Sequence, residues 1–357
     1  MTQSHSEKPH YLLLDGMRGV AAIAVVTGHA VHAAGELYPQ WQRLRPMGTP
    51  LAVDFFFCLS GFVIAYAYDA RFRGGMPVAE FVRRRLIRLY PMIALSVAIE
   101  IALKLVNDVF ISHSPPGHDL LMGVASWGLV PLGLLFNESP YINVPMWSLF
   151  FEFLANGIYG FNRGMLTSSN LAFGVLAAIS GLATLLVCLF YGIAQAGWYG
   201  YAGFVLGFVR IAYPFLAGLL IYRLGLPAKA PRLPDLVLMA GLAALLFAAP
   251  TSGYPVYSAL AVLLAFPLLV TLGAQATIMP ALKGIWRFLG DLSYPLYLIH
   301  PPVISSLAIL AGRVPGLMPA PLLIGLSLGL SIAAAYVVWK LFDRPVRGVL
   351  SRWAPAA

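Results

Sequence analysis

The chain consists of long apolar runs separated by short polar connections. Eleven of these runs approach the roughly 20 residues that an α-helix needs to cross a bilayer. They cover residues 12–33, 50–68, 89–107, 119–136, 146–162, 170–193, 201–222, 235–250, 255–274, 288–311 and 319–342. Because no connection is long enough to hold a soluble core, the pattern predicts an all-α, polytopic transmembrane bundle.

The basic residues indicate how many of these runs span. Run 119–136 is rich in glycine and is interrupted by Pro131. If it spans, the basic loop at 223–232 lies on the opposite side from the arginine-rich stretch 71–88. If it is re-entrant or interfacial, the large basic clusters share one side, as the positive-inside rule requires. We therefore predict about ten spanning helices, with both termini in the cytoplasm.

Composition supports this architecture. The chain is 60% hydrophobic and 10% charged, with a mean hydropathy of +0.81, which excludes an ordinary soluble domain. The net charge of +9 lies in short clusters between apolar runs, so topology explains it better than nucleic acid binding does. Cys58 and Cys188 lie inside apolar runs, which predicts buried thiols. We expect a single integral membrane domain over residues 1–357, with no appended soluble domain.

Three ionisable residues of the first apolar run share one helix face. Asp15, Arg18 and His29 fall within about 60° of one helix face, since each residue turns the helix by roughly 100°. Such groups are costly in a membrane unless they face a protein interior or a wet cavity. The stripe therefore predicts a functional acid, base and histidine system. His29 and His32 have a metal-compatible spacing, but no carboxylate motif accompanies them, and we predict no metal site.

Arginines gather just before the third run. Arg84, Arg85 and Arg88 lie in the stretch 81–91, and Arg84 and Arg88 are one helical turn apart. Guanidinium groups stay charged and present paired donors, which suits phosphate recognition. The alternative is a topology signal that also binds anionic lipid headgroups. We assign no functional role to the charges Asp54, Glu100 and Arg210 in other apolar runs, for which pairing between helices is the simplest account.

Two polar clusters lie in later runs. Ser148, Glu152 and Asn156 recur every four positions and share a helix face, where they either bind a hydroxyl or form a packing network. Tyr297 and His300 lie three residues apart on one face. A lone intramembrane histidine is more often structural than catalytic, so both interpretations of His300 stay open.

Five stretches, in this order, make the chain resemble acyltransferase family 3, a family of integral membrane O-acyltransferases. They are 14–22 (LDGMRGVAA) running on to His29, 55–64 (FFFCLSGFVI), 81–91 (FVRRRLIRLYP), 147–152 (WSLFFE) and 293–301 (SYPLYLIHP). The resemblance extends over essentially the whole chain. The main departures, Cys58 in the second stretch and Leu89-Tyr90 in the third, remove no polar group.

The resemblance implies a ten-helix fold that moves acyl groups, usually acetyl, from coenzyme A to hydroxyls of carbohydrates, lipid-linked glycans or antibiotics. It implies that His29 is the family's essential histidine and that Asp15 and Arg18 are the polar pair of the first helix. Glu152 falls on the family's glutamate, and His300 on a histidine near the end of the fold. The basic motif implied to meet the donor comprises Arg84, Arg85 and Arg88.

We therefore expect His29 to act as a general base that Asp15 or Glu152 orients. Donor contacts are expected from Arg18, Arg84, Arg85 and Arg88, and acceptor contacts from Ser148, Asn156, Tyr297 and His300. We expect no permanently bound cofactor, acyl-coenzyme A as co-substrate, a carbohydrate or glycolipid acceptor, and a lipid environment in the bacterial inner membrane. The alternatives are a transporter or flippase that uses the same polar stripe, and a structural partner of a polysaccharide assembly complex.

Overall fold

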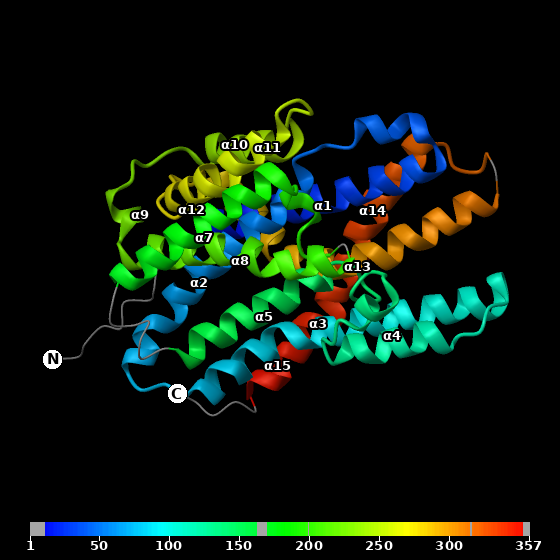
Figure 1. The fold of residues 1–357 in the computed structure, drawn as a ribbon, viewed down its shortest axis with the longest axis horizontal. Coiled ribbons are helices and arrows are strands. Elements are labelled where there is room, and N and C mark those ends of the chain that lie inside the picture. The colour runs from blue at the N-terminus through cyan, green and yellow to red at the C-terminus, as the bar shows by residue number, and fades with distance from the viewer. Residues whose placement is uncertain (1–10, 163–169, 199, 315, 353–357) are drawn as a thin grey trace.

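The computed structural model describes residues 11–162, 170–198, 200–314 and 316–352, and these residues form helices joined by turns (Figure 1). Among them, eight helical stretches are long and apolar enough to cross a membrane. Their helices are α1 (Leu12–Leu37), α2 (Ala52–Arg73), α3 (Val78–Val106), α7 (Asn170–Phe190), α8 (Gly200–Arg223), α11 (Tyr254–Leu260) with α12 (Phe266–Gly273), α13 (Lys283–Arg313) and α14 (Ala320–Val338). The prediction of an all-α polytopic bundle is confirmed.

Two of the ten predicted spans form shorter helices. Helix α5 (Met146–Phe161) has 16 residues and α10 (Asp235–Phe247) has 13. The remaining short helices are α4 (Gly117–Trp127), α9 (Leu226–Lys229) and α15 (Arg344–Arg352). Helix α3 begins at Val78, well before the apolar run at 89–107, so the predicted arginine cluster is itself helical.

The run 119–136 does not form one long helix. Helix α4 is only 11 residues long, and the chain turns at Leu129, whose φ is +54°. Lys104 pairs with Asp119 at 3.3 Å, and the indole of Trp127 donates to the Ala94 carbonyl, so α4 runs back along α3. Figure 1 shows the two helices side by side. A helix of this length is about half of what a span requires, as the glycines and proline in the run predicted.

Helices α1 and α13 run parallel and in close contact. A Cβ atom added to Gly19 would lie 2.6 Å from the carbonyl oxygen of Leu289, and one added to Gly290 would lie 2.6 Å from the Cβ of Asp15. Farther along both helices, His29 meets His300. Glycine at these positions permits an approach that any larger residue would prevent, which is a common way for membrane helices to associate.

Helices α2 and α8 form a second close pair. A Cβ atom on Gly61 would clash with the backbone of Phe215, and one on Gly218 would clash with the backbone of Cys58. Cys58 and Cys188 are buried and free, as predicted. Both helices contribute residues to the main buried core, together with α1 and α13.

The same helix pair contains a fully buried ion pair. Arg210 donates to both carboxylate oxygens of Asp54, at 3.0 and 2.8 Å, and to the carbonyls of Pro50 and Ala196. Its guanidinium also lies 5.1 Å from the centre of the Trp147 ring. Asp54 and Arg210 thus pair between two helices, whereas Glu100 forms no ion pair with a described residue.

Removing one partner of this pair should destabilise the fold strongly. We expect Asp54→Ala to lower the free energy of unfolding by about 3–5 kcal/mol, because it leaves a buried, uncompensated guanidinium. The double variant Asp54→Leu/Arg210→Met should lose less than Asp54→Ala alone, since no charge remains. Thermal unfolding in detergent measures both, with the exposed Arg232→Met as control. An Asp54→Ala variant as stable as the wild type would contradict the expectation.

Candidate active site

A cavity of about 620 Å³ lies between α1, α2, α3, α5 and α13, with the start of α15 at its edge. Its lining residues on α2 extend from Val53 to Ala67, which corresponds to about 21 Å of helix at 1.5 Å per residue. The cavity is therefore elongated along the bundle. Its charged lining residues are Asp15, Arg18, Arg85, Arg88, Glu152, Arg287, Asp291, Asp343 and Arg347.

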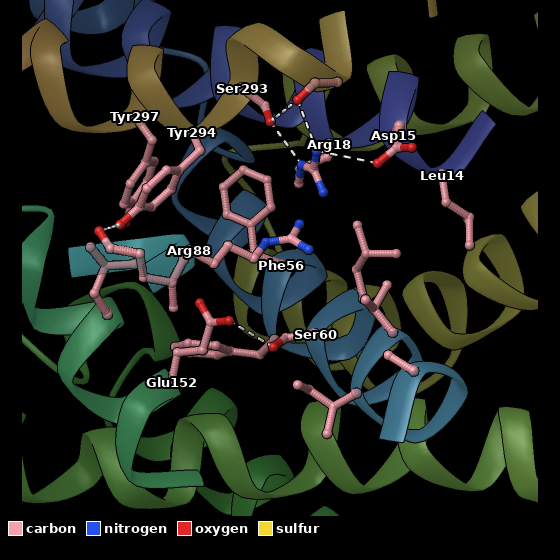
Figure 2. A pocket seen from close by; sticks show the side chains of 18 of the residues that line it. Leu14, Asp15, Arg18, Phe56, Ser60, Arg88, Glu152, Ser293, Tyr294 and Tyr297 are labelled. Atoms are coloured by element: carbon pink, nitrogen blue, oxygen red, sulfur yellow. Dashed lines mark hydrogen bonds and ion pairs between the residues drawn. The ribbon is translucent and has the colours of Figure 1, made fainter. Parts of the chain in front are cut away.

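Arg18 lies on the α1 side of this cavity. Its guanidinium donates to the Ser293 hydroxyl and to the Gly290 carbonyl, both at 2.8 Å. It also lies 3.2 Å from the Asp15 carboxylate, one helical turn earlier. Figure 2 shows Arg18 and Asp15 projecting from α1 toward the same space. The predicted first-helix pair therefore exists and is fixed in place by the start of α13.

Glu152 and Arg85 form the opposite polar wall. Arg85 donates to Oε1 of Glu152 at 2.7 Å, and the Ser60 hydroxyl donates to the same oxygen at 2.9 Å. Three helices, α2, α3 and α5, thus meet at one carboxylate. No hydrogen bond or ion pair joins Glu152 to His29 in the described part of the chain. In the structure, Glu152 therefore does not orient His29, which was one of the two alternatives expected.

Two arginines at the mouth of the cavity have no carboxylate partner among the described residues. Arg88 and Arg287 are exposed, and neither forms a hydrogen bond or ion pair with any residue that the structure describes. Arg347 also lines the cavity and pairs with the buried carboxylate of Asp343 at 2.6 Å. In Figure 2, Arg88 points from α3 into the cavity. The mouth therefore presents cationic groups that are free to bind an anion.

Arg287 and Arg347 were not among the residues predicted for the site. Both lie in basic clusters that the positive-inside rule already explains, so composition gave no reason to assign them to a site. The i, i+4 spacing of Asp343 and Arg347 was the available signal, because a helical carboxylate can hold an arginine in one orientation. The residue expected there, Arg84, lies outside the lining and is held by Glu80 of its own helix at 2.6 Å.

Tyr297 and Ser148 lie deep in the cavity. Their hydroxyls are 2.7 Å apart, and the Ser148 hydroxyl also donates to the Pro145 carbonyl. Phe56 packs edge-on against the Tyr297 ring, with the ring centres 5.7 Å apart. Tyr297 and Ser148, which we expected to contact the acceptor, both line the cavity. Asn156, expected to do the same, is buried outside the lining residues.

The two histidines meet one helical turn beyond Tyr297. His29 Nδ1 lies 2.8 Å from His300 Nε2, and the two rings have their centres 5.0 Å apart. Neither histidine is among the residues that line the cavity; His300 is fully buried, whereas His29 is partly exposed. Asp15 lies 14 residues before His29 on the same helix, about 21 Å away along the axis, so it cannot orient the ring. The partner of His29 is a histidine, where a carboxylate was expected.

Comparison with known proteins identifies the family of the chain. A family model described as "Acyltransferase domain", that of acyltransferase family 3, matches residues 11–340. "Protein 2 in picA locus" of Rhizobium radiobacter is 36% identical over 172 residues, which is 44% of this chain and 84% of that protein. No solved structure matches. The chain therefore belongs to acyltransferase family 3, and it is a multi-pass membrane acyltransferase.

Proposed function

We propose that this protein transfers an acyl group, most simply acetyl, from acyl-coenzyme A to a hydroxyl of a carbohydrate or glycolipid. The observation that carries the proposal is the elongated cavity. Arginines that are unpaired among the described residues lie at its mouth, and Tyr297 lies deep inside it, with its ring beside His300 of the histidine pair just outside the lining. The proposed location is the inner membrane, with the termini and the arginine mouth on the cytoplasmic side, where the basic clusters belong.

The mouth fits the nucleotide part of the donor. Coenzyme A carries a diphosphate and a ribose phosphate, and guanidinium groups bind phosphate oxygens through paired, charge-assisted hydrogen bonds. Arg88 and Arg287 are exposed and unpaired among the described residues, so a phosphate does not have to displace an existing partner. Arg347, held by Asp343, supplies a third cation from α15.

The length and lining of the cavity fit the thioester arm. Beyond the arginines, the wall becomes largely apolar, with Val53, Phe56, Phe57 and Leu149 in its lining. An extended, weakly polar arm can occupy such a passage and bring its thioester toward Tyr297. The phosphates would then stay at the wet mouth while the reacting carbon lies close to the histidine pair.

The reaction requires a base for the acceptor hydroxyl. The hydroxyl oxygen attacks the thioester carbonyl carbon, a C–O bond forms, and the C–S bond breaks. His29 takes the hydroxyl proton during the attack and returns it to the sulfur of the departing thiolate, so that no net proton is consumed. His29 suits this role because it is partly exposed, whereas His300 is enclosed.

Removing the unpaired arginines should weaken donor binding. We expect Arg88→Ala and Arg287→Ala each to raise the Kd for acetyl-coenzyme A by about 10- to 100-fold, the value of one charge-assisted contact. Calorimetry on the purified protein in detergent measures this. Arg73→Ala, an exposed arginine outside the cavity lining, should leave Kd unchanged. If neither variant weakens binding, the mouth is not the donor site.

Removing the base should leave binding intact. We expect His29→Ala to lower the acyl-transfer rate by about 10²- to 10⁴-fold, the usual contribution of general base catalysis, while Kd for acetyl-coenzyme A changes little. Release of free coenzyme A in the presence of acceptor measures the rate. Wild-type turnover by a normally folded His29→Ala protein would exclude His29 as the base. A well-folded wild type that binds no acyl-coenzyme A would instead favour transport.

A further inference from the structure

We infer that His300 is a positioning residue that fixes the tautomer of His29, so that the free lone pair of His29 lies on Nε2. The catalytic meaning of this arrangement rests on the proposed function. The arrangement of protons itself does not, because it follows from hydrogen-bond donors and acceptors alone.

His300 is protonated on Nδ1. Its Nδ1 lies 3.0 Å from the carbonyl oxygen of Leu296. A carbonyl oxygen only accepts hydrogen bonds, so Nδ1 of His300 carries a proton and donates it. The Tyr297 carbonyl also interacts with this ring. That carbonyl is available because Pro301, four residues later, has no N–H to offer it.

The proton on His300 determines which nitrogen of His29 is protonated. A neutral imidazole carries one N–H, so Nε2 of His300 has a lone pair and must accept. The atom 2.8 Å away is Nδ1 of His29, which therefore carries its proton there. The lone pair of His29 is then on Nε2, and no described residue is hydrogen-bonded to that atom.

The surroundings keep the pair neutral. No carboxylate is hydrogen-bonded or ion-paired to either ring in the described residues, and His300 is fully enclosed. The charged or titratable groups that face His29 are Arg45 and His32, and Tyr297 lies beside His300. None of these groups would stabilise a positive charge on the pair as a carboxylate would. Neutral His29 with a free Nε2 is the form that a general base requires.

Adjacent residues hold His300 at this position. Pro302 has no N–H for the Leu298 carbonyl, and the side-chain amide of the buried Asn143 donates to that carbonyl at 3.0 Å. The two prolines that follow His300 thus free two carbonyls of its own helix turn. One of these anchors α13 to the segment before α5, and the other faces the His300 ring.

The tautomer can be tested without any activity. Nitrogen-15 NMR of the histidine-labelled protein in detergent distinguishes a protonated from an unprotonated Nε2, and His29→Gln identifies which signals belong to His29. We expect His29 to be protonated on Nδ1 and bare on Nε2 in the wild type. His300→Gln keeps an accepting oxygen and should preserve this state, whereas His300→Phe should abolish it. A wild-type His29 protonated on Nε2 would overturn the inference.

Kinetics test the catalytic consequence. We expect His300→Phe to lower kcat by about 10²-fold or more at little change in KM for acetyl-coenzyme A, since a wrong tautomer removes the base. His300→Gln should recover most of that loss. His113→Phe, which replaces an exposed histidine outside the cavity lining, serves as the control.

The outcomes separate the two hypotheses. Equal loss in His300→Gln and His300→Phe, with both proteins folded by thermal unfolding, would mean that His300 acts only by packing and would overturn the inference. The expected NMR tautomer together with no acyl transfer by the wild type would refute the proposed function while leaving the proton arrangement in place.

Discussion

The site depends on the close parallel contact between α1 and α13. Gly19 faces the backbone of Leu289, and Gly290 faces Asp15, with no room for a side chain at either glycine. Because the helices touch, short hydrogen bonds can form between them at two levels, from Arg18 near one end and from His29 near the other. A larger residue at Gly19 would separate the helices and break both levels at once. The geometry around Arg18 and the geometry around His29 therefore depend on the same helix contact.

The opposite wall is fixed by buried charges rather than by glycine alone. The pair of Asp54 and Arg210 connects α2 to α8 and to the segments that carry Pro50 and Ala196. Arg85 and Glu152 similarly connect α3 to α5, with Ser60 of α2 as a third partner. Such pairs add little net stability because desolvation is costly, but they allow few alternative geometries. The cavity is consequently bordered by helices that these contacts hold together, and its exposed arginines, Arg88 and Arg287, lie at the mouth.

Helical spacing predicted which residues share a face, but it did not predict what covers that face. Arg84 and Arg88 are one turn apart, yet Arg84 is engaged by Glu80 while Arg88 enters the cavity. Asn156 follows Glu152 at the same spacing and is nevertheless buried elsewhere. The reason is that a neighbouring helix or a nearby carboxylate competes for each side chain, and periodicity contains no information about that neighbour.

The sequence by itself determined that the chain is a helical membrane protein, which runs form helices, and that Asp15, Arg18 and His29 are ionisable positions within the first of them. These properties are local: transfer of a residue into an apolar phase depends mainly on its own side chain. Only the tertiary structure decided that His300, 271 positions away, is the partner of His29, and that Arg287 and Arg347 join Arg88. A hydrogen bond forms only within about 2.7–3.2 Å and at a suitable angle, so its partners are set by how distant helices pack.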